Sequence, residues 1–358
     1  MSWINKKFFF IILMISLIVI IVEIFSTLAV HYRYKKDNPV IANTSLSSTY
    51  FVINRALIKF FFADTNMPKH DNVTSHPKPL FGPSDVQGYT NMPGDYIIRH
   101  YDHNNVNIYS ESRLYSESRV TILDDGTRYV GEPEKNTTKK VFVFGDSYVF
   151  GEGVSDEHTF TFLLQQKNRD KKFYLHAAGG WSLSNALANI IKLKEDIDTN
   201  DIVILGYGDY YKERHVAAPR RMRQYRSSRQ ILPSGLGHLK ISIDDSDEIV
   251  SEIIPLFCQD LGNYCKQHNP SEEYMNKVTK NLINEIATHI DARIILLHFK
   301  GDLNDPALVD LDSKIEVIPA TVETFKYEIR DDVMGFDMHP GPYWHHAIFL
   351  RVQKIFKE

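Results

Sequence analysis

The second half of the chain alternates between short apolar runs and longer amphipathic segments, and this alternation limits its fold more than any other feature. Five apolar runs have the length of β-strands, and four helical patterns are interspersed with them; the runs are 139–145, 172–179, 201–208, 292–299 and 314–320, and the helical patterns are 155–167, 182–196, 271–290 and 341–356. Strands that are apolar on both faces must be covered on both faces. The pattern therefore predicts an α/β domain over 136–358, with a parallel sheet between helical layers.

The residues before this domain differ in character. The segment from 31 to about 90 is rich in Pro, Ser and Asn, whereas Tyr96 to Val130 holds short β-branched runs and an Asp125-Gly126 pair typical of a hairpin turn. We expect residues 31–135 to form a linker and a small β-rich unit.

An apolar run from Phe8 to Val30, interrupted by Glu23, begins close to the amino terminus. As a helix it would measure about 34 Å, which is enough to cross a hydrocarbon core of roughly 30 Å. We expect residues 1–30 to form a cytoplasmic tip and a transmembrane anchor, and a cleaved signal peptide is the alternative. We expect a single-pass membrane protein whose domain over 136–358 lies in the periplasm or outside the cell.

The only two cysteines, Cys258 and Cys265, are separated by six residues. This spacing suits a small disulfide loop in an oxidising compartment, and two unrelated thiols are the alternative. The formal net charge of −4 argues against a general polyanion binder, so nucleic acid is not an expected partner.

The first strand of the domain ends in a turn that carries reactive groups. Gly145-Asp146-Ser147 follows the apolar run directly, and ligand sites in such folds lie at the carboxyl ends of the strands. A serine nucleophile needs a base and an orienting group. Asp337 and His339, on the loop before the last helical pattern, offer both.

These segments resemble the SGNH (GDSL-type) hydrolases. The resemblance covers residues 139–358 and rests on "FVFGDSYVFGEGVSDEHTF", "HAAGGWSLSNAL" and "DMHP". It implies a flavodoxin-like three-layer fold, with Ser147 as nucleophile, His339 as base and Asp337 as its orienting acid. It also implies an oxyanion hole, for which this chain offers Ser147, Gly180 and, at the position of the third donor, Gly208, and it implies neither a cofactor nor a metal. The adjacent His345 and His346 are interpreted as helix-surface residues, not as metal ligands.

The block after the third strand departs from the family pattern. Members carry an Asn there, whose side chain is an oxyanion donor, and this chain has Gly208. Losing one such donor typically lowers turnover by about 10²–10³. Either the Gly208 N–H or the Tyr210 hydroxyl replaces the donor, or activity is weak.

A long insertion, 212–270, follows the third strand and opens with six arginines between Arg214 and Arg229. The arginines suit recognition of an anionic group, and a solvated basic loop is the alternative. The predicted substrate contacts are Asp209, Tyr210, Arg214, Arg220, Arg221 and Arg223.

The sequence thus predicts a membrane-anchored serine hydrolase that cleaves or transfers an ester-linked acyl group on an envelope glycan or lipid. The alternative is a catalytically inactive SGNH-like binding module in an envelope assembly.

Overall fold

The computed structural model describes residues 73–77, 79–102, 113–227, 236–256, 261–299, 304–320 and 339–356. The chain divides into two compact units, 1–70 and 71–358, and all the described residues belong to the second.

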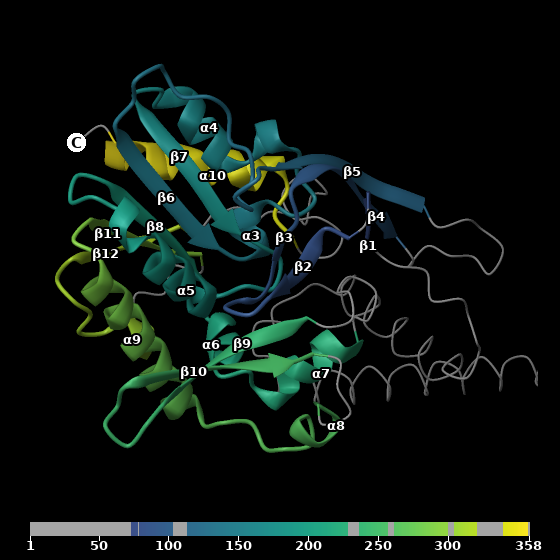
Figure 1. Cartoon of the computed structure of the whole chain (residues 1–358), viewed down its shortest axis with the longest axis vertical. Coiled ribbons are helices and arrows are strands. Elements are labelled where there is room, and N and C mark those ends of the chain that lie inside the picture. The colour runs from purple at the N-terminus through teal and green to yellow at the C-terminus, as the bar shows by residue number, and fades with distance from the viewer. Residues whose placement is uncertain are drawn as a thin grey trace, which may run out of the picture. The chain divides into compact units, whose positions relative to one another are not determined.

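A five-stranded parallel sheet forms the centre of this unit (Figure 1). Its strand order is β12-β11-β8-β6-β7, with bounds β6 Lys139–Gly145, β7 Lys171–Ala177, β8 Ile202–Tyr207, β11 Arg293–His298 and β12 Ile315–Pro319. All five strands coincide with predicted apolar runs. The central strand β6 pairs in parallel with β7 on one side and β8 on the other, so the expected α/β fold with a parallel sheet is confirmed.

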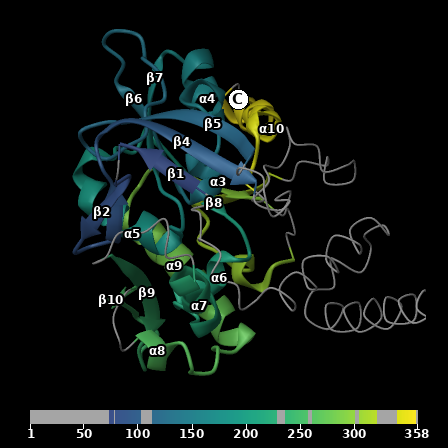
Figure 2. The ribbon, with the colours of Figure 1, turned by 90° about the vertical axis from the view of Figure 1, so that its right-hand side faces the viewer.

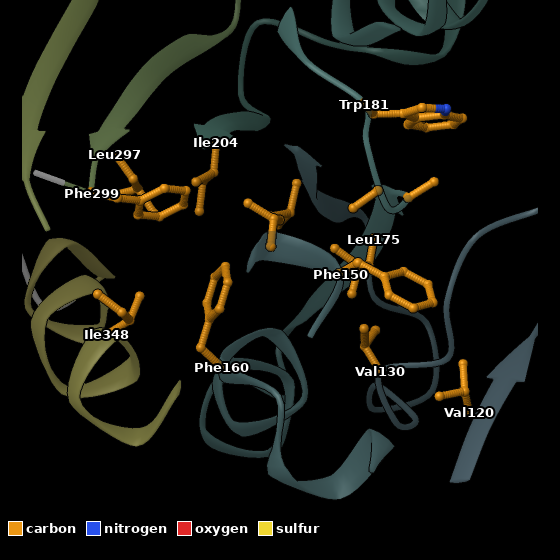
Figure 3. Close-up of a cluster of buried hydrophobic side chains, with 14 of the residues drawn as sticks. Val120, Val130, Phe150, Phe160, Leu175, Trp181, Ile204, Leu297, Phe299 and Ile348 are labelled. Atoms are coloured by element: carbon orange, nitrogen blue, oxygen red, sulfur yellow. The ribbon is translucent and has the colours of Figure 1, made fainter. Parts of the chain in front are cut away.

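Strand β6 shows why its sequence is apolar without alternation. Val141 and Val143 belong to one hydrophobic cluster, and Phe142 and Phe144 belong to a second. Successive side chains of a strand point to opposite faces, so both faces of β6 are buried. Figure 3 shows part of the first cluster, which includes Leu175 of β7, Ile204 of β8, Phe160 and Ile348.

Helices cover the two faces of the sheet. Their bounds are α3 Ser147–Phe150, α4 Phe160–Lys167, α5 Leu183–Leu193, α9 Glu272–His289 and α10 Pro342–Val352, with 3₁₀ turns at Asp156–His158, Lys194–Asp196, Pro306–Leu308 and Gln353–Phe356. Helices α4 and α10 lie on one side of the sheet and α5 and α9 on the other (Figure 1). The described part of the chain therefore has the three layers that the sequence predicts.

Local polar contacts begin two of these helices. Ser182 caps α5 in a capping box with Asn185, and the Ser271 hydroxyl accepts the Tyr274 N–H at the start of α9. The predicted start at Ser155 is wrong. Helix α4 begins at Phe160 with Thr159 as its N-cap, and Ser155 makes no capping hydrogen bond.

In its described residues, the small β-rich unit contains five strands. They are β1 Val73–His76, β2 Phe81–Ser84, β3 Gly88–Asn91, β4 Gly94–Asp102 and β5 Arg113–Ile122. β1, β4 and β5 form one antiparallel sheet, and β2 pairs with β3. The predicted turn follows β5, where Gly126 has a φ of +84° and donates its N–H to the Leu123 carbonyl. Arg128 then bridges to Leu175 and joins this unit to the edge strand β7.

The insertion is more regular than the sequence suggested. After α6 (Tyr211–His215) it contains α7 (Pro219–Ser227), an antiparallel hairpin of β9 (Gly237–Ile243) and β10 (Ile249–Pro255), and α8 (Leu261–Tyr264). Both ribbon views place these elements together on the α5–α9 side (Figures 1 and 2). The β9 strand packs against α5, α6 and α9.

Three predictions fall on residues outside the described ranges: the anchor over 1–30, the disulfide partner Cys258 and the orienting acid Asp337. Within the described ranges, no helix has the length and apolar character needed to span a bilayer. The disulfide stays a prediction, and Cys265 is buried.

Candidate active site

The predicted nucleophile Ser147 lies on a turn at the end of β6. We call this turn, residues 145–151, the nucleophile turn. Gly145 closes the strand, Asp146 caps α3, and Ser147 is the first residue of α3. A side chain on Gly145 would put its Cβ 2.2 Å from Val149, so glycine is needed for α3 to fold back over the strand end. Gly151 ends the helix in the left-handed region, with a φ of +82°. Ser147 is 3% exposed at this sharp turn.

Asp146 is held by groups from both sides of the turn. Its side chain accepts hydrogen bonds from the Tyr148 N–H (3.0 Å), the Tyr210 hydroxyl (3.0 Å) and Nη1 of Arg214 (2.7 Å). Its own N–H donates to the Tyr211 hydroxyl at 3.0 Å. Burial, and then the charge of Asp146, raise the pKa of both tyrosines well above the usual value, so both hydroxyls keep their protons. These contacts fix the residue that precedes Ser147.

The second loop, Gly179 to Trp181, follows β7 and carries the predicted oxyanion donor Gly180. Gly180 has a φ of +82°, a conformation that favours glycine. Strand β3 supports this loop, because the Tyr89 hydroxyl donates to the Gly179 carbonyl at 2.6 Å and the Trp181 indole donates to the Tyr89 carbonyl at 3.3 Å. This support from the β-rich unit was not predictable from the sequence, because its hydrogen bonds join residues about 90 positions apart.

His339 lies beside the nucleophile turn. Its ring centroid is 6.0 Å from that of Tyr148, the residue after Ser147, and its Nε2 is 3.6 Å from Oε2 of Glu152. Glu152 also lies close to the second loop, because a Cβ on Gly179 would come within 3.0 Å of its carboxylate. Asp337 lies outside the described residues, so its role as orienting acid stays a prediction. Glu152 is not among the site residues that the sequence predicts.

At the end of β8, the ring of Tyr210 occupies the space where a side chain of residue 208 would lie. A Cβ on Gly208 would lie 2.6 Å from Cε1 of Tyr210, so the Tyr210 ring fills the position of a side chain there. The Tyr210 hydroxyl donates to Asp146 and is therefore not available as the replacement oxyanion donor. The Gly208 N–H stays the predicted donor from this block.

This packing predicts that Gly208→Asn does not restore a normal oxyanion hole. The new Cβ would push the Tyr210 ring aside, and we expect a loss of about 1–3 kcal/mol in the free energy of unfolding, together with lower turnover. Gly208→Ala is the matched control, because it adds the same Cβ without an amide, and we expect a similar loss. Thermal unfolding and kcat on a short ester measure both effects. A roughly 100-fold rise in kcat for Gly208→Asn at unchanged stability would contradict this account.

Asp209, a predicted substrate contact, belongs to a second polar cluster at the ends of β8 and β11. Its Oδ1 is 3.0 Å from Nε2 of the fully buried His298, and Asp305 lies close enough for the three to surround an ion. However, Asp305 already receives the Lys212 ammonium at 2.6 Å and the Tyr207 hydroxyl at 2.8 Å. The lysine neutralises the carboxylate that a metal would need. The Asp209 side chain is 36% exposed and can face a ligand.

The arginines of the insertion do not act as one group. Arg214 is buried against Asp146, which contradicts its prediction as a substrate contact. Arg220 and Arg221 both face Glu213, and Arg223 donates to the Cys265 carbonyl. Arg220 and Arg223 are both exposed, and the Arg220 side chain is 59% exposed beside Glu213, so these two of the four are placed to meet an anionic ligand.

One prediction for the last helix is wrong. His345 is fully buried and not on the helix surface, and it accepts the Phe160 N–H at Nδ1 (3.3 Å). Burial lowers the pKa of His345 to about 3, so it is neutral and packs α10 onto α4. His346 is exposed as predicted.

No protein-family model matches the chain, and no curated protein matches its sequence. Solved structures that match include a lipolytic G-D-S-L family protein from Veillonella parvula (13% identity, 62% of this chain and 100% of that chain, TM-score 0.36). They also include the psychrotrophic esterase EstA from a Pseudoalteromonas species (12% identity, 61% and 99%, TM-score 0.35) and an acetylxylan esterase from Geobacillus stearothermophilus (14% identity, 62% and 95%, TM-score 0.31). Similarity at this level does not define the activity of this chain.

Proposed function

We propose that this protein is a serine hydrolase that cleaves or transfers an ester-linked acyl group. The observation that carries the proposal is the position of His339, which comes from the far end of the sequence and lies beside Tyr148 and Glu152 on the turn that begins with Ser147. A serine at the start of a sharp turn, with an imidazole packed against that turn, supports nucleophilic catalysis, in which a base takes the serine proton.

The proposed reaction has two steps. His339 takes the Ser147 proton as the serine oxygen attacks the ester carbonyl, and the same proton passes to the departing alcohol. Backbone N–H groups of Ser147, Gly180 and Gly208 stabilise the oxyanion in both steps. In the second step, His339 takes a proton from water, or from a second hydroxyl, as its oxygen attacks the acyl-enzyme carbonyl, and gives that proton to the departing Ser147 oxygen. Water gives hydrolysis and the second hydroxyl gives transfer. Asp337 orients His339.

The proposed substrate is an acyl ester on an envelope glycan or lipid. The apolar segment 8–30 supports a membrane anchor. The spacing of Cys258 and Cys265, which suits a disulfide in an oxidising compartment, supports a position of the described unit outside the cytoplasm. Arg220, exposed on α7, and the half-exposed Asp209 are the polar groups proposed to meet the substrate around the site.

A fluorophosphonate probe tests the proposal without knowledge of the natural ester. We expect the full-length protein, purified in detergent, to form one covalent adduct on Ser147, because the probe reacts with serines that have an adjacent base. Peptide mass spectrometry locates the adduct. Ser155→Ala, which removes a serine eight residues further on, is the matched control and should label as the wild type does. A folded protein that forms no adduct would refute the hydrolase.

That result would favour the second candidate, a catalytically inactive binding module in an envelope assembly. Gly208 in the place of Asn, with the Tyr210 hydroxyl bound to Asp146, is the observation that favours it.

A further inference from the structure

A buried arginine reaches two loops of the proposed active site at once. Arg214 lies on α6, and its Nη1 donates to Oδ2 of Asp146 at 2.7 Å and to the Trp181 carbonyl at 2.9 Å. Asp146 precedes Ser147, and Trp181 follows Gly180. One guanidinium nitrogen therefore connects the nucleophile turn to the loop of the predicted oxyanion donor.

The surroundings of Arg214 hold it in this position. Its guanidinium carbon lies 4.8 Å from the centroid of the Tyr210 ring and 5.5 Å from that of Tyr211. The His238 ring on β9 donates to the Arg214 carbonyl at 2.7 Å, and burial lowers the pKa of His238 to about 4. The hairpin of the insertion thus anchors the backbone from which the arginine extends.

The same contacts account for the departure in the third block. Because Gly208 has no side chain, the Tyr210 ring can lie over it, stack on Arg214 and donate to Asp146. The family pattern places a polar side chain after β8. In this chain, Tyr210 and Arg214 lie there instead, and both donate hydrogen bonds to the Asp146 carboxylate of the nucleophile turn.

We propose that Arg214 is a positioning residue that sets the distance between Ser147 and the Gly180 loop. The proposal rests on the proposed hydrolase function. A displacement of about 1 Å between a nucleophile and its oxyanion donors can lower turnover by about 100-fold. The Arg214 side chain is 11% exposed and Asp146 is fully buried, so direct binding of substrate does not explain the pair.

The variants Arg214→Lys and Arg214→Met test this role. Lysine keeps the charge but lacks the planar fork, so we expect kcat on a short neutral ester to fall about 10- to 100-fold, and further for methionine. We expect KM to change by less than about threefold, because substrate binding is not removed. Active-site titration with the fluorophosphonate corrects kcat for the folded fraction. Asp146→Asn should lower kcat similarly, and combining it with Arg214→Met should add little.

Lys212→Met is the matched control. Lys212 lies on the same helix. Its ion pair with Asp305 is buried to a similar degree, with side-chain exposures of 11% for Lys212 and 4% for Asp305. Among the hydrogen bonds of the described residues, the Lys212 side chain makes none to the nucleophile turn or to the Gly180 loop. We expect it to lower the melting temperature comparably and to leave kcat per titrated site within about twofold. A merely structural role for Arg214 predicts the same kcat for both variants, and that result would overturn the proposal.

Hydrogen exchange separates this proposal from the hydrolase itself. In Arg214→Lys, amides of 146–151 and of 178–182 should exchange faster together, and in Lys212→Met they should not. Unchanged exchange in both loops would also overturn the proposal. Faster exchange in a protein whose wild type forms no phosphonate adduct would support the coupling of the loops and refute the hydrolase.

Discussion

Replacing Ser147 by alanine should lower kcat for ester hydrolysis by at least about 10⁴-fold, since the remaining site can only bind and polarise the ester. His339→Ala should have an effect of similar size, because the serine oxygen is a weak nucleophile without its base. The double variant should be no worse than either single one, since the two groups act as a unit. Steady-state hydrolysis of a short neutral ester measures all three.

Ser155→Ala again serves as the control. Its hydroxyl accepts the Arg119 N–H on β5 and lies outside the proposed chemistry, so activity should stay near the wild-type value. If Ser147→Ala hydrolyses the same ester at the wild-type rate, Ser147 is not the nucleophile and the interpretation of this turn is wrong. Additive losses for Ser147 and His339 would show instead that the two residues do not cooperate.

The strands of the parallel sheet were predictable because their physical signal is local. A run such as Val141 to Phe144 must lie between two apolar layers, and the structure places it there. The start of α4 was not predictable in the same way. Ser155 has the residue type of an N-cap, but its hydroxyl is bound to Arg119 of the preceding unit, and Asp156 is paired with Arg128. Tertiary contacts therefore override the local capping preference, and the helix begins at Phe160.

In the candidate site, too, residues with a local sequence signal were predictable, and residues placed by tertiary contacts were not. Ser147 and His339 could be proposed as site residues from their residue types and from their positions at the ends of loops. The burial of the Arg214 side chain could not be predicted, because its partner Asp146 is 68 residues away and an arginine-rich segment usually faces solvent. The positions of Glu152 beside His339 and of Tyr89 at the Gly179 carbonyl were not predicted for the same reason, since their partners are distant in the sequence. Side chains that act through contacts distant in sequence leave no periodic or spacing signal.

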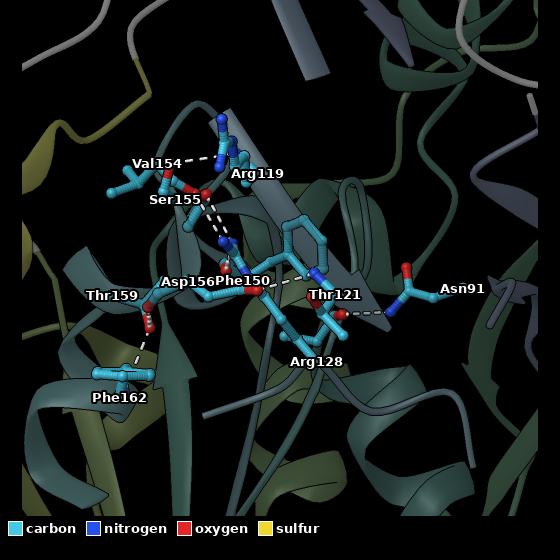
Figure 4. A network of polar contacts seen from close by, with 12 residues as sticks. Asn91, Arg119, Thr121, Arg128, Phe150, Val154, Ser155, Asp156, Thr159 and Phe162 are labelled. Atoms are coloured by element: carbon cyan, nitrogen blue, oxygen red, sulfur yellow. Dashed lines mark hydrogen bonds and ion pairs between the residues drawn. The ribbon is translucent and has the colours of Figure 1, made fainter. Parts of the chain in front are cut away.

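Arg128 lies between the β-rich unit and the nucleophile turn, and its environment predicts a large effect on stability. The side chain is fully buried and donates to the carbonyls of Phe150 (2.5 Å), Gly151 (2.9 Å) and Val154 (2.6 Å) (Figure 4). It also pairs with Asp156 at 2.7 Å. The Phe150 and Gly151 carbonyls lie at the C-terminal end of α3. Arg128 therefore joins the β-rich unit to the C-terminal end of the helix that begins with Ser147.

Arg128→Met should therefore lower the free energy of unfolding by about 3–5 kcal/mol, because it leaves Asp156 buried without its partner charge. Burial raises the pKa of Asp156, and Arg128 opposes that rise, so the loss of the arginine removes the group that favours the carboxylate. Urea unfolding followed by tryptophan fluorescence measures the change.

The double variant Arg128→Met, Asp156→Asn removes the unpaired charge and keeps an acceptor for the Thr121 N–H, so it should be more stable than Arg128→Met alone. If the double variant is less stable than the single one, the unpaired carboxylate is not the source of the loss, and the three carbonyls left without a donor account for it.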